Sequence, residues 1–386
     1  MSLIKKLKSS VLLRDSAIYT IAELINKAIP FLLLPILTAY LSTADYGIVS
    51  NYQMLCNILM LIVGVSTHTA ITVNYFRIEI EEIKHYVTSV LYILLGSSVV
   101  LFLLFLLLGR FVETAIEVNY EWVIIAVIYS TAQFLNTLVV KIYILRREPI
   151  RVAIFQIVRT LIDVGLTLYL IMMLDMTWEG RLIGLTVSGI IYSFVSFYIL
   201  YKLGLLVKSL NLKYIKDALK IGIPLIPHQL SGWLKNGADR FFITSLVSLQ
   251  ANGIYSLAFQ LGLVLLILFQ SFNQAFAPYL YKNLVKATIE DKIKIVKITY
   301  VFVIGLVICV LLGVVLGPIV LHYIIDEKFY EALDIIPLVF IAFGFKGLYF
   351  MVVNYLIFEK ATALLAKITF SISLLHLLLS YLLSDG

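Results

Sequence analysis

Cysteine and charged side chains are both scarce in this sequence. Two cysteines occur among its 386 residues, and Asp, Glu, Lys and Arg together make up 14%. Cys56 and Cys309 lie within apolar stretches and offer neither a disulfide framework nor a metal-ligand spacing, so we expect no metal site and no cofactor. The sequence also lacks a P-loop pattern and a loop long enough for a nucleotide-binding domain. We therefore expect no ATPase activity.

The longest predicted external loop also lacks the usual catalytic residue types. The longest external connection, Gly109 to Glu121, contains Arg110 and acidic residues but no His, Cys or Ser. A membrane-bound polymerase or glycosyltransferase usually needs such residues in an aqueous loop. The sequence therefore predicts that the chain is not an enzyme.

Hydrophobic residues make up 61% of the chain, and its mean hydropathy is +1.01. Apolar stretches of about 20 residues can each cross a bilayer, where the backbone has to be helical to satisfy its own hydrogen bonds. The pattern predicts an all-α polytopic membrane protein with eleven spans. They are expected at residues 16–41, 46–70, 87–108, 122–145, 152–174, 182–201, 221–247, 253–281, 296–321, 332–357 and 361–383.

Lys and Arg are concentrated in alternate loops between these spans. If the amino terminus is cytoplasmic, nearly all of them face the cytoplasm, and the opposite side has only Arg110, Arg181 and Lys328. This asymmetry follows the positive-inside rule and predicts that orientation. The net charge of +7 is then explained by loops facing anionic membrane lipids, and no nucleic-acid partner is needed.

A weak internal repeat indicates how the spans are organised. Ser42, Gly47, Ile48 and Ser50 have identical counterparts 206 positions later (253 minus 47), at Ser248, Gly253, Ile254 and Ser256. The same shift superposes the early spans on later ones and carries the sixth beyond residue 386. We therefore expect two bundles of six helices related by an axis along the membrane normal. Residues 1–209 would form the first bundle with a cytoplasmic linker, and 210–386 the second, with its last span missing.

Charged residues inside the predicted spans mark a candidate binding site, because a cation at the bilayer centre costs about 2.5 kcal/mol or more. Those that we place towards the middle of the membrane are the basic residues Lys27, Arg159, Lys235, Arg240, Lys346 and Lys367 and the acidic residues Glu23, Asp163 and Asp239. Several share a helix face with other polar residues, as Arg159 and Asp163 do in the fifth span. We expect these stripes to line one cavity between the two halves.

Pairing within a helix is the main structural alternative to a binding role. Three opposite-charge pairs are four residues apart, namely Glu23 and Lys27, Arg159 and Asp163, and Lys235 and Asp239. Such pairs can neutralise each other, and Lys141 and Lys367 can snorkel to the cytoplasmic interface. Cations nevertheless outnumber carboxylates in the spans. We predict that the surplus binds a phosphate-bearing group, to which arginines can make bidentate contacts.

Two segments carry a family resemblance. GIPLIPHQLSGWLKNGADRFFI, from Gly222 to Ile243, and the early run PFLLLPILTAYLSTADYGIVS resemble Wzx-type flippases of bacterial polysaccharide biosynthesis. The likeness extends over essentially the whole chain. It implies two six-helix bundles, as in the multidrug, oligosaccharidyl-lipid and polysaccharide exporter superfamily, although this chain has eleven predicted spans where twelve or more are usual.

The resemblance also implies a substrate, a location and partners. The substrate would be an undecaprenyl-diphosphate-linked oligosaccharide, such as an O-antigen or capsule repeat unit, moved from the cytoplasmic to the outer leaflet of the bacterial inner membrane. A polysaccharide polymerase and a chain-length regulator would be partners. The family's cationic cavity is similar in character to the set of Lys27, Arg159, Lys235, Arg240 and Lys346.

Alternating access is the expected mechanism, driven by a proton or sodium gradient. Glu23, Asp163 and Asp239 are the candidate ion-coupling carboxylates. Two other functions remain open. A multidrug or small-solute cation antiporter of the same superfamily would favour acidic residues, whereas a lipid II flippase carries the same diphosphate and is not separated by charge.

Overall fold

The computed structural model describes residues 31–286, 288–359 and 361–384, together with residues 18, 21, 22, 24–26, 28 and 29. The described residues form helices joined by short connections, and none of them lies in a β-strand. This confirms the all-α prediction. Two of the predicted site residues, Glu23 and Lys27, lie outside the described part of the chain.

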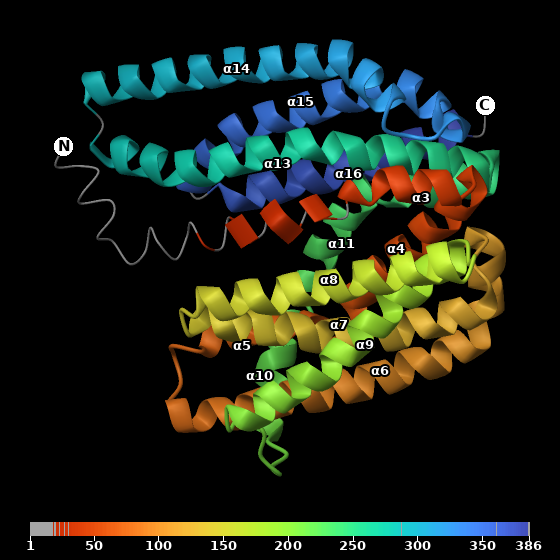
Figure 1. Ribbon diagram of the computed structural model, residues 1–386. Helices are drawn as coiled ribbons and strands as arrows, with labels where there is room; N and C mark the ends of the chain where they lie inside the picture. Colours follow the sequence, from red (N-terminus) through yellow and green to blue (C-terminus); the bar gives the residue numbers. More distant parts are fainter. Residues whose placement is uncertain are drawn as a thin grey trace. The chain divides into compact units, whose positions relative to one another are not determined.

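The chain divides into two compact units, which are described separately. The first contains residues 1–33, 48–249 and 384–386. Its four longest helices, α6 to α9, pack against one another (Figure 1). The elements of this unit are α4 (Thr43–Ile62, from Ile48 on), η1 (Val63–Ser66), α5 (His68–Asn74), α6 (Ile80–Ile116), α7 (Tyr120–Leu145), α8 (Pro149–Met173), α9 (Trp178–Lys202), α10 (Leu212–Gly222), α11 (Leu225–Asn236), α12 (Ala238–Phe242) and the π-helix η2 (Ile243–Val247).

The second unit contains residues 34–47 and 250–383. In it α14 and α15 pack along each other. Its elements are α3 (Leu34–Tyr40), the first turn of α4, α13 (Leu249–Lys286), α14 (Ile289–His322), η3 (Glu327–Phe329), α15 (Glu331–Phe358) and α16 (Thr362–Ser384). The predicted division of the chain at residues 209 and 210 stays a prediction.

Repeat-related residues meet inside the second unit. Gly253, at the start of α13, packs so closely on the start of α4 that a Cβ atom there would overlap the carbonyl oxygen of Thr43 and lie 3.1 Å from the nitrogen of Gly47. Asn252 Nδ2 donates to the Gly47 carbonyl at 3.3 Å, and Tyr46 Oη donates to Gln260 Oε1 at 2.7 Å. The two glycines matched by the internal repeat therefore lie at one helix crossing, where only a residue without a side chain fits at position 253.

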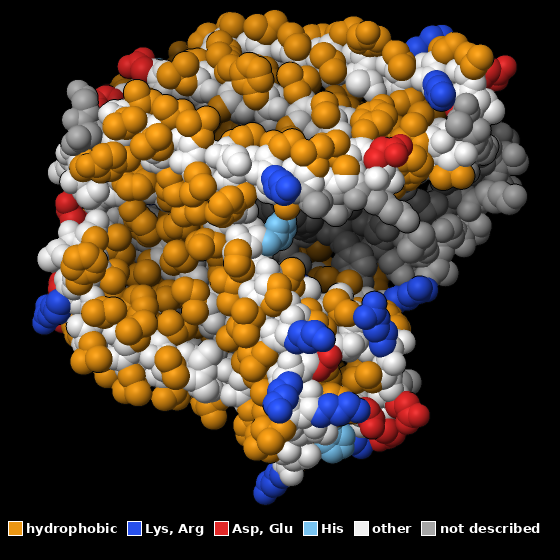
Figure 2. Space-filling view, turned by 180° about the vertical axis from the view of Figure 1, so that it is seen from behind, with side chains coloured by type: hydrophobic (Ala, Val, Ile, Leu, Met, Phe, Trp, Pro, Cys, Tyr) orange, Lys and Arg blue, Asp and Glu red, His pale blue; other side chains and the backbone are white. Residues whose placement is uncertain are grey.

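Nine helices of the described chain are long and apolar enough to cross a membrane. Figure 2 shows a surface that is mostly hydrophobic on the visible side, with charged side chains gathered at the lower right of the view. An apolar surface of this extent fits contact with lipid. The protein is therefore a multi-pass membrane protein.

The seventh predicted span, residues 221–247, is not one continuous helix. Gly237 leaves the helical conformation at φ −151° and ψ −23° and separates α11 from the short helix α12. The π-helix η2 follows. The predicted span 221–247 is therefore divided among α11, α12 and η2.

The second predicted span, residues 46–70, is also broken. Gly64, Val65 and Ser66 all have positive φ, at 64°, 53° and 54°. The ring of Phe134 on α7 fills the place that a side chain at residue 64 would occupy. Gly64 N donates to Ser97 Oγ at 2.9 Å, and Thr67 Oγ1 donates to the Gly64 carbonyl at 2.5 Å. Backbone groups released by the break are thus satisfied within the protein, as membrane depth requires.

A short amphipathic helix, α10, precedes α11 in the chain. Its buried face includes Tyr214 and Ala218, whereas Lys213, Lys216 and Lys220 are exposed. Tyr214 donates a hydrogen bond to Glu82, which together with burial raises the pKa of the phenol to about 12. This helix is too short to span a bilayer and has the composition of one lying at a membrane surface.

Candidate functional site

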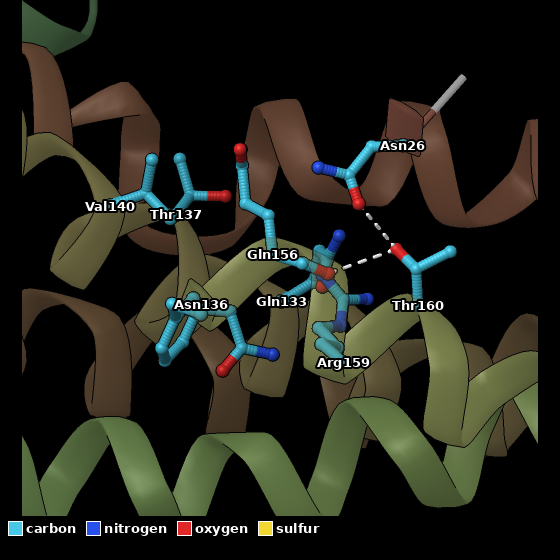
Figure 3. Close-up of a pocket in the computed structure, with 9 residues that line it drawn as sticks. Asn26, Gln133, Asn136, Thr137, Val140, Gln156, Arg159 and Thr160 are labelled. Atoms are coloured by element: carbon cyan, nitrogen blue, oxygen red, sulfur yellow. Dashed lines mark hydrogen bonds between the residues drawn. The ribbon is translucent and has the colours of Figure 1, made fainter. Parts of the chain in front are cut away.

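A polar cavity of about 290 Å³ opens within the first unit (Figure 3). We call it the Arg159 cavity. It is lined by Asn26, Gln133, Asn136, Thr137, Val140, Phe155, Gln156, Arg159 and Thr160. The residues of α7 and of α8 in this set recur every three or four positions, so each helix contributes one face. The structure thereby brings polar side chains of the fourth predicted span, on α7, together with those of the fifth, on α8.

Arg159 is the basic residue of this lining. It is half-buried, and its Nη2 lies 3.4 Å from Tyr129 Oη, which is a weak contact with a neutral group. Within the described part of the chain, Arg159 forms no ion pair with a carboxylate. Its guanidinium therefore keeps most of its capacity to bind an anion.

Polar neighbours of Arg159 differ in how firmly they are held. Thr160 Oγ1 lies 2.9 Å from Asn26 Oδ1 and 3.0 Å from the Gln156 carbonyl. Asn136 donates to the Gly189 carbonyl at 3.1 Å and so is anchored on α9. Gln133 Oε1, in contrast, is buried without a hydrogen-bond partner among the described residues. The cavity thus offers a cation, hydroxyl and amide groups, and one unsatisfied acceptor.

Asp163 pairs with a different arginine from the one expected. Arg181 Nη1 donates to Asp163 Oδ1 at 2.7 Å and to Thr167 Oγ1 at 3.0 Å. The exposed fractions of the Arg181 and Asp163 side chains are 7% and 16%, so the pair is buried. From the sequence, Arg181 is expected in an outer loop, one residue before the predicted start of the sixth span. It lies instead in the first turn of α9, and it neutralises Asp163 in place of Arg159.

Asp239 and Arg240 lie on α12 and are both buried. Arg240 Nη1 is 3.7 Å from Asp239 Oδ1 and 3.8 Å from Met54 Sδ. Lys235 is half-buried in the last turn of α11. Because Gly237 interrupts the helix between Lys235 and Asp239, their four-residue spacing does not place them on one helix face.

The last two predicted cations belong to the second unit. Lys346 is half-buried on α15, with its Nζ 5.9 Å from the centre of the Phe343 ring. Lys367 is exposed on α16. Of the five predicted binding cations that the structure describes, Arg159 alone is among the lining residues of the Arg159 cavity. The binding roles of all six stay predictions.

Comparison with known proteins gives a family match and a fold match. The polysaccharide biosynthesis protein family matches residues 12–284. Protein 1 of the Lsg locus of Haemophilus influenzae is 29% identical over 280 residues, which cover 70% of this chain and 66% of that protein. The chain thus spans slightly less than two thirds of the length of this relative.

Two solved transporter structures are similar over nearly their whole lengths. An inward-facing MATE multidrug transporter of the MOP superfamily has a TM-score of 0.60 at 14% identity, covering 93% of each chain. A MOP superfamily transporter from Pyrococcus furiosus has a TM-score of 0.59 at 14% identity, covering 97% of this chain and 94% of the other. The fold is therefore that of the MATE transporters.

Proposed function

Because this chain belongs to the polysaccharide biosynthesis protein family, we propose that it is a flippase for undecaprenyl-diphosphate-linked oligosaccharide repeat units. It moves them from the cytoplasmic to the outer leaflet of the bacterial inner membrane, with its own amino terminus in the cytoplasm. The observation that carries the proposal is Arg159, a half-buried guanidinium in a polar cavity without a carboxylate partner among the described residues.

The charge balance around Arg159 favours an anionic guest. Asp163, one helical turn away, is engaged by Arg181 at 2.7 Å and so does not neutralise it. A cation in a membrane-embedded cavity is costly unless a counter-charge is present. A diphosphate supplies that charge, and its oxygens match the paired donors of a guanidinium.

The sign of this charge argues against a cation antiporter. A cationic drug would be repelled by Arg159, whereas a diphosphate would be attracted. A Pyrococcus furiosus transporter of the same fold is described as having a binding pocket of reverse polarity that suggests a different function. That description supports the view that the charge of the pocket, and not the fold, sets the cargo.

Alternating access moves the headgroup while the polyprenyl tail remains in lipid, and no covalent step is needed. A proton or sodium gradient supplies the energy. The described coupling carboxylates, Asp163 and Asp239, each lie beside an arginine, so an entering cation competes with that arginine. The displaced guanidinium gains capacity for phosphate, which links ion binding to cargo binding. A polysaccharide polymerase and a chain-length regulator then act on the exported repeat unit.

Substituting Arg159 tests the proposal. Arg159→Ala should weaken binding of undecaprenyl diphosphate roughly tenfold to a hundredfold, because a charge-assisted hydrogen bond is worth about 1.5–3 kcal/mol. Cells relying on this variant should lose surface polysaccharide while the protein remains at normal abundance in the membrane. Calorimetry on purified protein measures the affinity for undecaprenyl diphosphate. Immunoblotting of cells measures the surface polysaccharide and the abundance of the protein.

Arg110→Ala is the matched control. Arg110 is 70% exposed and pairs with Glu113 three residues away, outside the Arg159 cavity. This variant should export normally. Normal export by Arg159→Ala would refute the assignment of the cavity. The same binding assay with lipid II in place of the oligosaccharide lipid distinguishes the two diphosphate cargoes. The natural cargo should bind more tightly than undecaprenyl diphosphate without a sugar, and the other lipid should not.

A further inference from the structure

A second, larger cavity of about 450 Å³ lies within the first unit. We call it the Trp233 cavity. It is lined by Met54, Asn57, Met60, Leu61, His68, Gln229, Gly232, Trp233 and Gly237. None of these lining residues is Lys, Arg, Asp or Glu. The Trp233 cavity therefore differs in chemistry from the Arg159 cavity, although both belong to one unit.

Its aromatic wall is held in a fixed orientation. Trp233 Nε1 donates to the Met54 carbonyl at 3.1 Å, and the indole lies 5.5 Å from the ring of Phe241, centre to centre. The side chain is nevertheless only half-buried, so part of the ring remains accessible from the cavity. A rigid, amphipathic ring of this kind binds ligands at a small cost in conformational entropy.

His68 provides a second and independent indication of a ligand. The residue is 9% exposed, and its ring packs edge-on against Phe134 with centres 5.4 Å apart. Its Nδ1 atom is buried without a hydrogen-bond partner among the described residues. Leaving such a group unsatisfied costs roughly 1–3 kcal/mol, and His68 is one of the residues that line the cavity.

Both helix breaks of the first unit border this cavity. Leu61 and His68 flank the interruption at Gly64 to Ser66, and Gly237 is the interruption between α11 and α12. Discontinuous helices are where transporters of this general design place their substrates. The position therefore fits a binding cavity better than a packing defect.

We infer that the Trp233 cavity binds a neutral sugar residue of the lipid-linked glycan, an inference that rests on the proposed function. The indole can stack on the C–H face of a sugar ring. The amides of Asn57 and Gln229 and the imidazole of His68 can each donate to or accept from sugar hydroxyls. An acyl chain would leave these polar groups unsatisfied, and a phosphate would find no cation among the described lining residues.

Gly232 allows the cavity to be filled without disturbing the fold. A Cβ atom added there meets no atom within 4 Å, and the residue lies inside α11, where replacing glycine generally favours the helix. Gly232→Leu should therefore fold and occupy cavity space. Gly96→Leu is the matched control, because Gly96 on α6 is also open to a Cβ atom and is exposed outside both cavities.

The experiment measures dissociation constants by calorimetry on the purified full chain. The ligands are polyprenyl diphosphates carrying N-acetylglucosamine, galactose or no sugar, with polyprenol as the uncharged reference. The native protein should bind at least one glycosylated lipid about tenfold more tightly than the bare diphosphate, as expected for one stacked ring with hydrogen bonds. Gly232→Leu should abolish this preference and leave the affinity for the bare diphosphate unchanged, whereas Gly96→Leu should retain it.

A second variant, His68→Phe, keeps the ring contact with Phe134 and removes both nitrogens. It should reduce the sugar preference while still binding the bare diphosphate. The inference is overturned if the native protein shows no preference for either sugar, or if the preference survives in Gly232→Leu. The proposed function fails separately if the affinity for the bare diphosphate is no higher than the affinity for polyprenol.

Discussion

The surroundings of the half-buried Arg159 differ from those of Arg181 and Arg240, which are buried in the first unit. Arg181 lies 2.7 Å from Asp163, and Arg240 lies 3.7 Å from Asp239. The hydrogen-bond partner of Arg159 is the neutral Tyr129. At the scale of single residues, the structure therefore separates arginines held by carboxylates from one that faces a cavity.

Removing the carboxylate of Asp163 tests this separation. Asp163→Asn should destabilise the protein by about 3–5 kcal/mol, because it leaves the guanidinium of Arg181 buried without its counter-charge. Glu113→Gln, which breaks the exposed pair with Arg110, should cost at most about 1 kcal/mol. Thermal unfolding of detergent-solubilised protein measures both. Equal losses in the two variants would contradict a buried pairing of Asp163 with Arg181.

Helix positions were largely predictable from the sequence, and helix interruptions were not. The predicted span 122–145 corresponds to α7 (Tyr120–Leu145), and 332–357 to α15 (Glu331–Phe358). Hydropathy locates such helices because each is apolar along its length. The break at Gly64 depends on the ring of Phe134, which is 70 positions away (134 minus 64) and leaves no local signal. The prediction for Arg181 was wrong because the sixth span was predicted to begin at residue 182, whereas α9 begins at Trp178. Arg181 was therefore assigned to a loop.

The crossing of α4 and α13 gives a prediction at the scale of elements. Gly253→Ala should destabilise the protein by roughly 1–3 kcal/mol, because its methyl group overlaps the Thr43 carbonyl and forces the helices apart. Gly305→Ala on α14 is the control, since a Cβ atom there meets nothing within 4 Å. It should be neutral or stabilising by up to about 1 kcal/mol. Similar unfolding midpoints for the two variants would show that the helices do not cross this closely.

The chemical character of the candidate site could be predicted from the sequence, but the full set of residues that line the cavities could not. Residue type and helical spacing identified Arg159 and its polar neighbours on α7 and α8, because one face of each helix carries them. The Trp233 cavity was missed because its wall combines residues from α4, α5 and α11 that share no sequence period. Cavities built at helix breaks depend on tertiary contacts that a single helical stripe does not reveal.

For the whole molecule, the positive-inside pattern yields a test of orientation. In a background with Cys56 and Cys309 replaced by alanine, Lys208→Cys should react with a membrane-impermeant maleimide only from the cytoplasmic side. Asn119→Cys should react only from the opposite side. Both positions are exposed, and surface substitutions usually change stability by no more than about 0.5 kcal/mol. Labelling of intact cells and of inverted vesicles distinguishes the two faces. Labelling of both cysteines from the same side would refute the topology, and labelling of each from the side opposite to the predicted one would reverse it.

The helix break at Gly64, Val65 and Ser66 stores elastic free energy. A left-handed conformation costs a residue with a side chain roughly 1–2 kcal/mol, and Val65 and Ser66 both adopt it. Rewinding the segment into a continuous helix would release this strain and would displace Leu61 and His68 from the wall of the Trp233 cavity. A bound sugar would hold the strain in place, whereas an empty cavity favours its release. If the Trp233 cavity binds a sugar as we infer, cargo binding would therefore stabilise the interrupted form of this helix against the continuous one.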